Sequence, residues 1–122
     1  MGRKKIYSKD HIWVCKQEDM AVIGLSRYAL QQLGQVVFLN LPEVGEQFAQ
    51  GEIFGDIESI KNVSDLIFPL NGKVMKVNEG LMDTPEILDD DVEKSWLLQV
   101  RAESYPENFM DEDAYQKYVG QL

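Results

Sequence analysis

Cysteine and histidine are almost absent from this sequence of 122 residues, which contains one of each, Cys15 and His11. One cysteine forms no intramolecular disulfide, and the pair falls short of the four ligands of a structural zinc site. A hydrolase triad or a Cys–His pair would need His11 as its base, but His11 precedes Cys15 by four residues in a segment that predicts a β-strand. The sequence therefore excludes a structural zinc site, and we expect neither a metal centre nor a catalytic Cys–His pair.

Positive charge and long apolar runs are also scarce. The chain has 12 Lys and Arg against 21 Asp and Glu, a formal net charge of −9, which disfavours binding to a phosphate backbone. An apolar run such as residues 36–39 is far shorter than the ~20 residues that cross a bilayer. Residues 1–5 are basic but lack the apolar segment of a secretory signal. We expect no nucleic-acid or membrane partner, and a cytoplasmic protein, or a mitochondrial-matrix protein if the chain is a mature eukaryotic form.

Short apolar segments separated by turn residues dominate the first half of the chain. A spacing of roughly eight to twelve residues between turn signals is typical of small antiparallel sandwiches and barrels. A chain of this length buries roughly two thirds of its unfolded surface, enough for one core. We therefore predict a single, mainly β domain over residues 1–122. The expected strands are residues 12–16, 20–25, 36–41, 53–58, 66–68, 72–78 and 96–101.

Two helices are predicted from their end signals. Ser26 is a suitable N-cap for a short internal helix, and Gly34 a suitable residue to end it. Asp111 begins a C-terminal helix whose first turn is acidic, and Gly120 closes it. Residues 84–88, Thr-Pro-Glu-Ile-Leu, predict one further helical turn with proline at its first position.

A polar link around residues 59–64 joins two apolar strands and predicts a β-hairpin with Lys61 near its tip. A protruding turn suits a lysine that another enzyme must modify, because the turn can enter that enzyme's active site while the scaffold stays folded. The chain has nine lysines, so position alone leaves open that Lys61 is an ordinary surface lysine.

Many segments in one order resemble the H protein of the glycine cleavage system. The resemblance covers nearly the whole chain, which makes it far more specific than a single motif. The similar segments are residues 7–14, 23–25, 33–38, 41–45, 58–61, 63–65, 69, 71–74, 77–79, 85–88 and 96–98, followed by the acidic C-terminal helix.

The resemblance implies a barrel-sandwich hybrid (lipoyl-domain-like) fold of two antiparallel sheets, with lipoic acid held by an amide bond on Lys61. We call this modified side chain the arm. The implied protein is a carrier and not an enzyme: glycine decarboxylase loads an aminomethyl group, a tetrahydrofolate-dependent aminomethyltransferase removes it, and dihydrolipoyl dehydrogenase reoxidises the dithiol. A lipoate ligase or lipoyltransferase would attach the cofactor. The acidic surface would guide encounters with basic partners.

Three further residues are expected to serve the arm. Glu58, three residues before Lys61, marks the turn for the lipoylating enzyme or is an ordinary exposed carboxylate. Asp65 matches an acid that the resemblance places near the loaded arm. His11, expected on the same strand face as Trp13, is predicted to be structural or to contact the arm, and not to act in acid–base chemistry.

Three places depart from the family pattern: Ile12, Gln32, and the segment Glu93-Lys94-Ser95, which replaces the usual glycine-containing lead into Trp96. Ile12 stands where an acid is usual, and isoleucine neither accepts a hydrogen bond nor balances an amine's charge. Gln32 stands where a histidine is common. Two functions therefore stay open: the shuttle of glycine cleavage, which the extent of the resemblance favours, and an H-like lipoyl relay that donates lipoyl groups to the acyltransferase subunits of 2-oxoacid dehydrogenases.

Biotin is the competing cofactor, because biotin-carrying domains place a lysine on a similar turn. They usually flank that lysine with methionines, whereas Lys61 has Ile60 and Asn62 beside it. The biotin-like sequence Val-Met-Lys-Val at residues 74–77 lies in a predicted strand and not in a turn. We therefore expect lipoate and not biotin.

Overall fold

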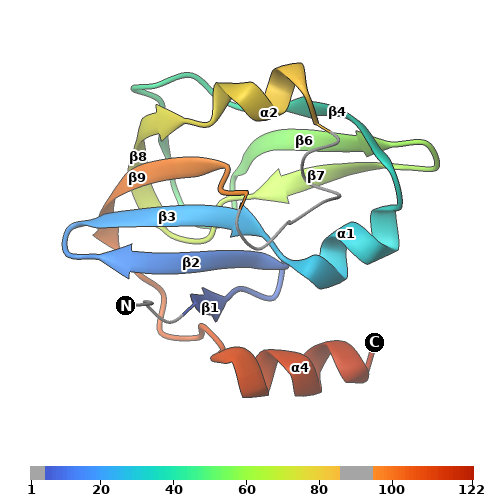
Figure 1. Cartoon of the computed structure of the whole chain (residues 1–122). Helices are drawn as coiled ribbons and strands as arrows, with labels where there is room; N and C mark the ends of the chain where they lie inside the picture. The colour runs from blue at the N-terminus through green and yellow to red at the C-terminus, as the bar shows by residue number, and fades with distance from the viewer. Residues whose placement is uncertain (1–4, 86–94) are drawn as a thin grey trace.

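Two antiparallel β-sheets form the body of the molecule in a computed structural model that describes residues 5–85 and 95–122 (Figure 1). The larger sheet has the strand order β1 (Lys5–Tyr7), β2 (Ile12–Gln17), β3 (Met20–Leu25), β9 (Leu98–Ser104), β8 (Asn71–Val77) and β5 (Gln47–Phe48). The smaller sheet has the order β4 (Val36–Asn40), β6 (Ile53–Ser59) and β7 (Val63–Ile67). The mainly β, two-sheet prediction is confirmed.

The main core lies between the two sheets, where one face of each long strand contributes buried apolar residues. Removing a large aliphatic or aromatic side chain from water contributes about 1.5–3 kcal/mol, so this core dominates the stability of the fold. Its completely or almost completely buried members include Ile12, Val14, Ile23, Leu39, Ile57, Leu66, Phe68, Val74, Leu98 and Val100.

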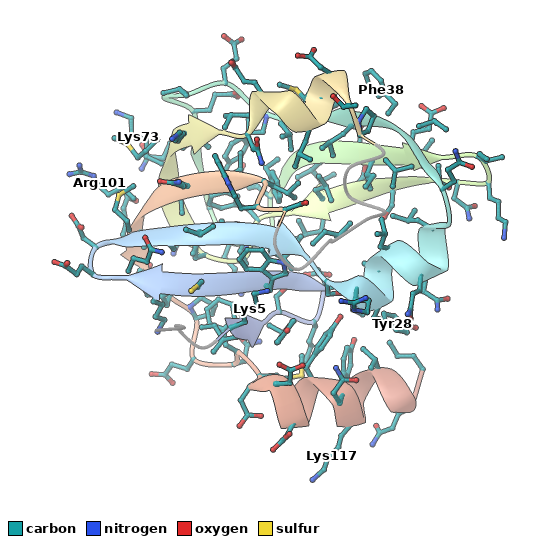
Figure 2. The ribbon with its side chains drawn as sticks, viewed as in Figure 1. Lys5, Tyr28, Phe38, Lys73, Arg101 and Lys117 are labelled. Atoms are coloured by element: carbon teal, nitrogen blue, oxygen red, sulfur yellow. The ribbon has the colours of Figure 1, made fainter. Side chains whose placement is uncertain are left out.

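A second, aromatic cluster covers the other face of β2. Trp13 alternates with Ile12 and Val14, and it packs with Tyr7 of β1 and Tyr115 of the C-terminal helix. This helix, α4 (Glu112–Gly120), lies across the outer side of β1 and β2, and Lys117 points from its far side into solvent (Figure 2). The first three residues of β2 are therefore buried, although their side chains point to both faces of the sheet.

The end signals predicted for the internal helix and the C-terminal helix are confirmed. In α1 (Arg27–Leu33), the Ser26 hydroxyl accepts the Ala29 N–H, and Gly34 ends the helix with φ 85°. In α4, the Asp111 side chain accepts the Ala114 N–H, and Gly120 is the last helical residue. Within the described ranges no helix is long and apolar enough to cross a membrane.

The sequence pattern does not predict several short elements. Strands β1 and β5 have three and two residues, and α2 (Glu79–Asp83) has five with one buried side chain, Leu81. Such segments carry too few residues to show a period, and their partners in the fold hold them. The turn expected at residues 84–88 falls mostly outside the described residues. Thr84, its expected cap, ends α2 by donating its N–H to the Gly80 carbonyl.

Strand limits differ from expectation where polar residues or irregular pairing interrupt the pattern. Strand β7 starts at Val63 and not at residue 66, and β9 runs from Leu98 to Ser104 and not from 96 to 101. In β8, the register shifts between Val74 and Lys76. That β-bulge explains why the alternation in this strand is poor.

Gly24 provides a test of the aromatic cluster. It pairs with Trp13 across β2 and β3, and a Cβ on Gly24 would overlap the Trp13 indole ring. We expect Gly24→Ala to lower the free energy of unfolding by about 1–3 kcal/mol, because the buried indole must move. The control is Gly120→Ala, where a Cβ meets no atom within 4 Å and helix propensity favours alanine by ~1 kcal/mol. Urea denaturation measures both, and equal effects would contradict this packing.

Candidate functional site

The β6–β7 hairpin projects from the smaller sheet and carries Lys61 in its turn (Figure 1). Its strands pair antiparallel, with Ile57 opposite Ser64 and Glu58 opposite Val63. The buried Ile57 side chain anchors the hairpin in the core, whereas Lys61 is exposed. The structure therefore places Lys61 in the three-residue turn at residues 60–62, as the polar link predicts.

Ser59 holds the turn in shape. Its hydroxyl accepts the N–H groups of Lys61 (3.2 Å) and Asn62 (3.0 Å) and donates to the Asn62 carbonyl (3.2 Å). The Ser59 backbone N–H donates to the same carbonyl at 2.8 Å. A serine hydroxyl that binds backbone groups two and three residues on stabilises a tight turn. Ser59 is only 4% exposed, so water competes little for these bonds.

Sequence reasoning did not identify Ser59 as a site residue. The available signal was a serine two residues before the lysine, at the end of an apolar strand. The backbone of the next residue is held from outside the hairpin, because the Ile60 N–H donates to the Gln35 carbonyl at 3.1 Å. Together these bonds fix the backbone on the N-terminal side of Lys61.

A cavity of about 400 Å³ lies beside the hairpin. Three parts of the chain form it: the turn between β1 and β2, helix α1, and the β6–β7 hairpin. Its polar wall includes His11, Gln32 and Asp65, and its apolar wall includes Leu25 and Leu66. Ligand sites commonly combine apolar walls with a few polar groups in cavities of this size.

The two predicted carboxylates lie in different places. Asp65, on the edge strand β7, is exposed and lines the cavity. Glu58 is also exposed and pairs across the sheet with Phe38 and Val63, but it does not itself line the cavity. The structure therefore brings His11 and Asp65 to the same cavity, whereas Glu58, on the same sheet face as Asp65, is not part of the cavity wall.

The expectation that His11 shares a strand face with Trp13 is wrong. His11 precedes β2 and turns the chain with φ 69°, a left-handed conformation that histidine adopts more readily than most residues. Two backbone bonds hold this turn: the His11 N–H donates to the Ser8 carbonyl (3.1 Å), and the Ser26 N–H donates to the His11 carbonyl (2.9 Å). The turn directs the half-buried ring to the cavity.

The His11 ring is surrounded by tyrosines. Its Nδ1 atom lies 2.8 Å from the Tyr115 hydroxyl, and its ring centroid lies 4.9 Å from that of Tyr28 and 6.1 Å from that of Tyr118. Burial lowers the pKa of His11 because it penalises the charged ring, and the nearby Asp10 carboxylate opposes this effect. At neutral pH the uncharged His11 ring is therefore the favoured form.

Ile12 and Gln32 occupy different environments, and residues 93–94 of the third departure lie outside the described residues. Ile12 is completely buried in the main core and is not part of the cavity wall. Gln32 of α1 lines the cavity. Cys15 is half-buried beside the aromatic cluster, on the face of β2 opposite Ile12. Within residues 5–85 and 95–122, no group of three or more His, Cys, Asp or Glu side chains is arranged to hold a metal ion.

Comparison with known proteins agrees with this geometry. The family model described as "Glycine cleavage H-protein" matches residues 5–121. A glycine cleavage system H protein from Staphylococcus epidermidis is 38% identical over 118 residues, 94% of this chain and 94% of that protein. The corresponding protein from Thermotoga maritima is 39% identical over 122 residues, 98% of each.

A solved structure extends the match to three dimensions. The crystal structure of a glycine cleavage system H protein from Mycobacterium marinum has a TM-score of 0.91 to this chain, with 31% sequence identity. The match covers 98% of this chain and 99% of that one. Sequence and fold thus agree over almost the full length, and the chain belongs to the glycine cleavage system H-protein family.

Proposed function

We propose that this chain is a lipoyl-carrying shuttle, which moves an aminomethyl group from glycine decarboxylase to aminomethyltransferase on an arm at Lys61. The observation that carries the proposal is an exposed lysine, held at the tip of a bonded hairpin beside a cavity that contains a carboxylate. The chain acts as one lipoyl-carrier domain over residues 1–122, and the expected cytoplasmic location stays a prediction.

The hairpin offers Lys61 to the enzyme that modifies it. Ile60 in the turn and Val63 directly after it are 69% and 65% exposed, so the tip can enter an active site without unfolding. Glu58 pairs with Phe38 of the neighbouring strand β4, and Phe38 is 51% exposed. We assign the surface formed by Phe38, Glu58 and Val63 to recognition by a lipoate ligase or lipoyltransferase, with Glu58 as its charged group.

The residues around the cavity fit the arm. When attached, the lipoyl group supplies the sulfurs that carry the aminomethyl group and that are oxidised and reduced. The Asp65 carboxylate accepts hydrogen bonds from an amine and balances its charge. Leu25 and Leu66 exclude water from the cavity wall. The chain itself supplies reach and shelter, and the catalytic groups belong to its partners.

The partners in this proposal are glycine decarboxylase, aminomethyltransferase and dihydrolipoyl dehydrogenase, besides the lipoylating enzyme. Each must meet the same arm in turn, so lasting binding to any one of them would slow the cycle. A net charge of −9 steers encounters with basic surfaces. Added salt screens this attraction, so it suits transient binding.

Lys61→Arg tests the attachment point. We expect no mass increase with lipoate and lipoate ligase, because the guanidinium of arginine is not acylated, and no support of glycine decarboxylation. The matched control is Lys76→Arg in β8, which alters the biotin-like sequence and leaves the hairpin unchanged. Intact mass and peptide mapping identify the modified residue. Modification of the Lys61→Arg protein, or biotin at Lys76 in the wild type, would refute the assignment.

Ser59→Ala tests the turn. Loss of the hydroxyl removes its hydrogen bonds to Lys61 and Asn62 and is expected to slow lipoylation roughly fivefold, the equivalent of about 1 kcal/mol. The control is Ser64→Ala on the facing strand, whose exposed hydroxyl makes no hydrogen bond to the rest of the described chain. Rates come from the time course of the mass increase. If both variants react like the wild type, turn shape does not limit recognition.

The shuttle and the lipoyl relay differ in their need for the cavity. We expect the lipoylated protein to support glycine-dependent release of carbon dioxide by glycine decarboxylase, and Asp65→Asn to reduce that activity about tenfold, because a charge-assisted hydrogen bond is lost. Asp56→Asn is the control, because Asp56 pairs with Asp65 across the hairpin but does not line the cavity. No carbon dioxide release, together with lipoyl transfer to an acyltransferase domain, would establish the relay instead.

A further inference from the structure

A hydrogen-bond network links the C-terminal helix to the cavity. The Tyr115 hydroxyl lies 2.7 Å from Ser26 Oγ and 2.8 Å from His11 Nδ1. Ser26 and Tyr115 are 1% and 2% exposed, so both hydroxyl groups are shielded from water. The Tyr115 ring stacks on Tyr7 with centroids 4.3 Å apart and planes inclined by 7°, which fixes the position of its hydroxyl.

One arrangement of the hydrogen atoms satisfies both hydroxyl groups within these three residues. Ser26 Oγ already accepts the Ala29 N–H at 3.2 Å, and its own hydrogen has one acceptor among the described residues, the Tyr115 oxygen. Tyr115 therefore accepts from Ser26, and within the network its own hydroxyl hydrogen points to His11 Nδ1. In the reverse arrangement, the buried Ser26 hydrogen has no acceptor within the described chain, and such a loss costs about 1–3 kcal/mol.

The arrangement determines which ring nitrogen of His11 carries the proton. If Nδ1 accepts from Tyr115, the neutral ring holds its proton on Nε2. Nε2 has no hydrogen-bond partner in the described ranges, and it is not among their fully buried unsatisfied atoms, Trp13 Nε1 and Tyr105 Oη. It therefore keeps contact with solvent, and the ring to which it belongs lines the cavity.

We propose that Tyr115 is a positioning residue for the arm site: it holds the neutral His11 ring with its proton on Nε2, so that His11 presents an N–H donor to the cavity. The atoms that it suits are hydrogen-bond acceptors of the arm, a sulfur or the amide oxygen. This inference rests on the proposed function for its ligand, but the ring's protonation pattern is a property of the unmodified chain.

The surroundings of His11 favour this neutral donor. The groups packed around the ring are Asp10 in its own turn, Tyr28 of α1, and Tyr115 and Tyr118 of α4, with Asp65 of β7 on the same cavity. Burial lowers the pKa of His11 more than Asp10 raises it. An uncharged N–H donor complements Asp65: one side chain serves acceptors of the arm, and the other serves its amine.

The network also gives α4 a role at the cavity. Tyr115 lies 104 residues from His11 in the sequence. The helix reaches β1 through the stack on Tyr7 and through paired backbone bonds between Tyr7 and Met110, at 2.8 and 2.9 Å. Tyr28, which packs against His11, lies on the side of α1 that faces α4 (Figure 2). A displaced α4 would therefore release the His11 ring.

The test uses the single histidine, whose two ring nitrogens give unambiguous NMR signals after ¹⁵N labelling of a full-length chain without a histidine tag. We expect the neutral ring of the unmodified wild type to be protonated at Nε2. In Tyr115→Phe, the pKa of His11 is expected to rise toward its ordinary value, because the donor that stabilises the neutral ring is lost. Phenylalanine retains the ring that stacks on Tyr7.

One variant serves as a control and a second tests the direction of the network. Tyr118→Phe removes a hydroxyl from the same helix that donates to the Lys9 carbonyl (3.4 Å) and not to His11, so the titration should match the wild type. Ser26→Ala removes the hydroxyl that sets the direction of the network, so the preference for a proton on Nε2 should weaken, and it also removes the N-cap hydrogen bond of α1. A proton on Nδ1 in the wild type, or an unchanged or lowered pKa in Tyr115→Phe, would overturn the proposal.

Lipoylation gives the second measurement. We expect the Nε2–H signal to shift when Lys61 carries the lipoyl group, and Tyr115→Phe to lose most of that shift. An identical His11 spectrum before and after modification of the wild type would overturn the contact between His11 and the arm. Intact mass reports separately whether Lys61 is modified: a chain that accepts no lipoyl group refutes the proposed function, while the unmodified protein still decides the direction of the network.

Discussion

The antiparallel pairing of β6 with β7 is the constraint on which the site depends. A lysine that serves other proteins must stay in water, yet its backbone must not move freely. The buried Ile57 sets the register of the hairpin, because a slip by one residue would turn it out of the core. Ser59 then closes the turn, so Lys61 has a mobile side chain on a held backbone. The same strand pairing therefore buries Ile57 in the core and presents Lys61 to solvent.

The cavity beside the hairpin is built from parts that are distant in sequence. Asp65 comes with the hairpin, whereas His11 comes from the turn before β2 and Gln32 from α1. Trp13 of β2 and Tyr115 of α4 are buried in the same aromatic cluster, which holds α4 to the larger sheet. Because His11 and Tyr115 share a hydrogen bond, the packing of α4 and the polarity of the cavity are coupled.

Local sequence predicts the part of this site that lies on the hairpin. Alternating apolar residues predict most strands, and the polar link at 59–64 predicts the hairpin and the place of Lys61, since these signals need only neighbouring residues. The predicted strand 66–68 omits the start of β7, because Ser64 and Asp65 are polar. These residues belong to an edge strand and are exposed to solvent. The same logic misplaced His11, whose left-handed turn is stabilised by a bond from Ser26, a residue fifteen positions away.

By itself, the sequence determined the mainly β fold class, the caps of α1 and α4, the hairpin and its exposed lysine. Each depends on periodicity, capping or turn chemistry within about ten residues. Only the tertiary structure decided that Ile12 faces the core, that Asp65 but not Glu58 lines the cavity, and that Tyr115 bonds to His11. These relations join side chains across sheets and helices, and their geometry exists only once the two layers have packed.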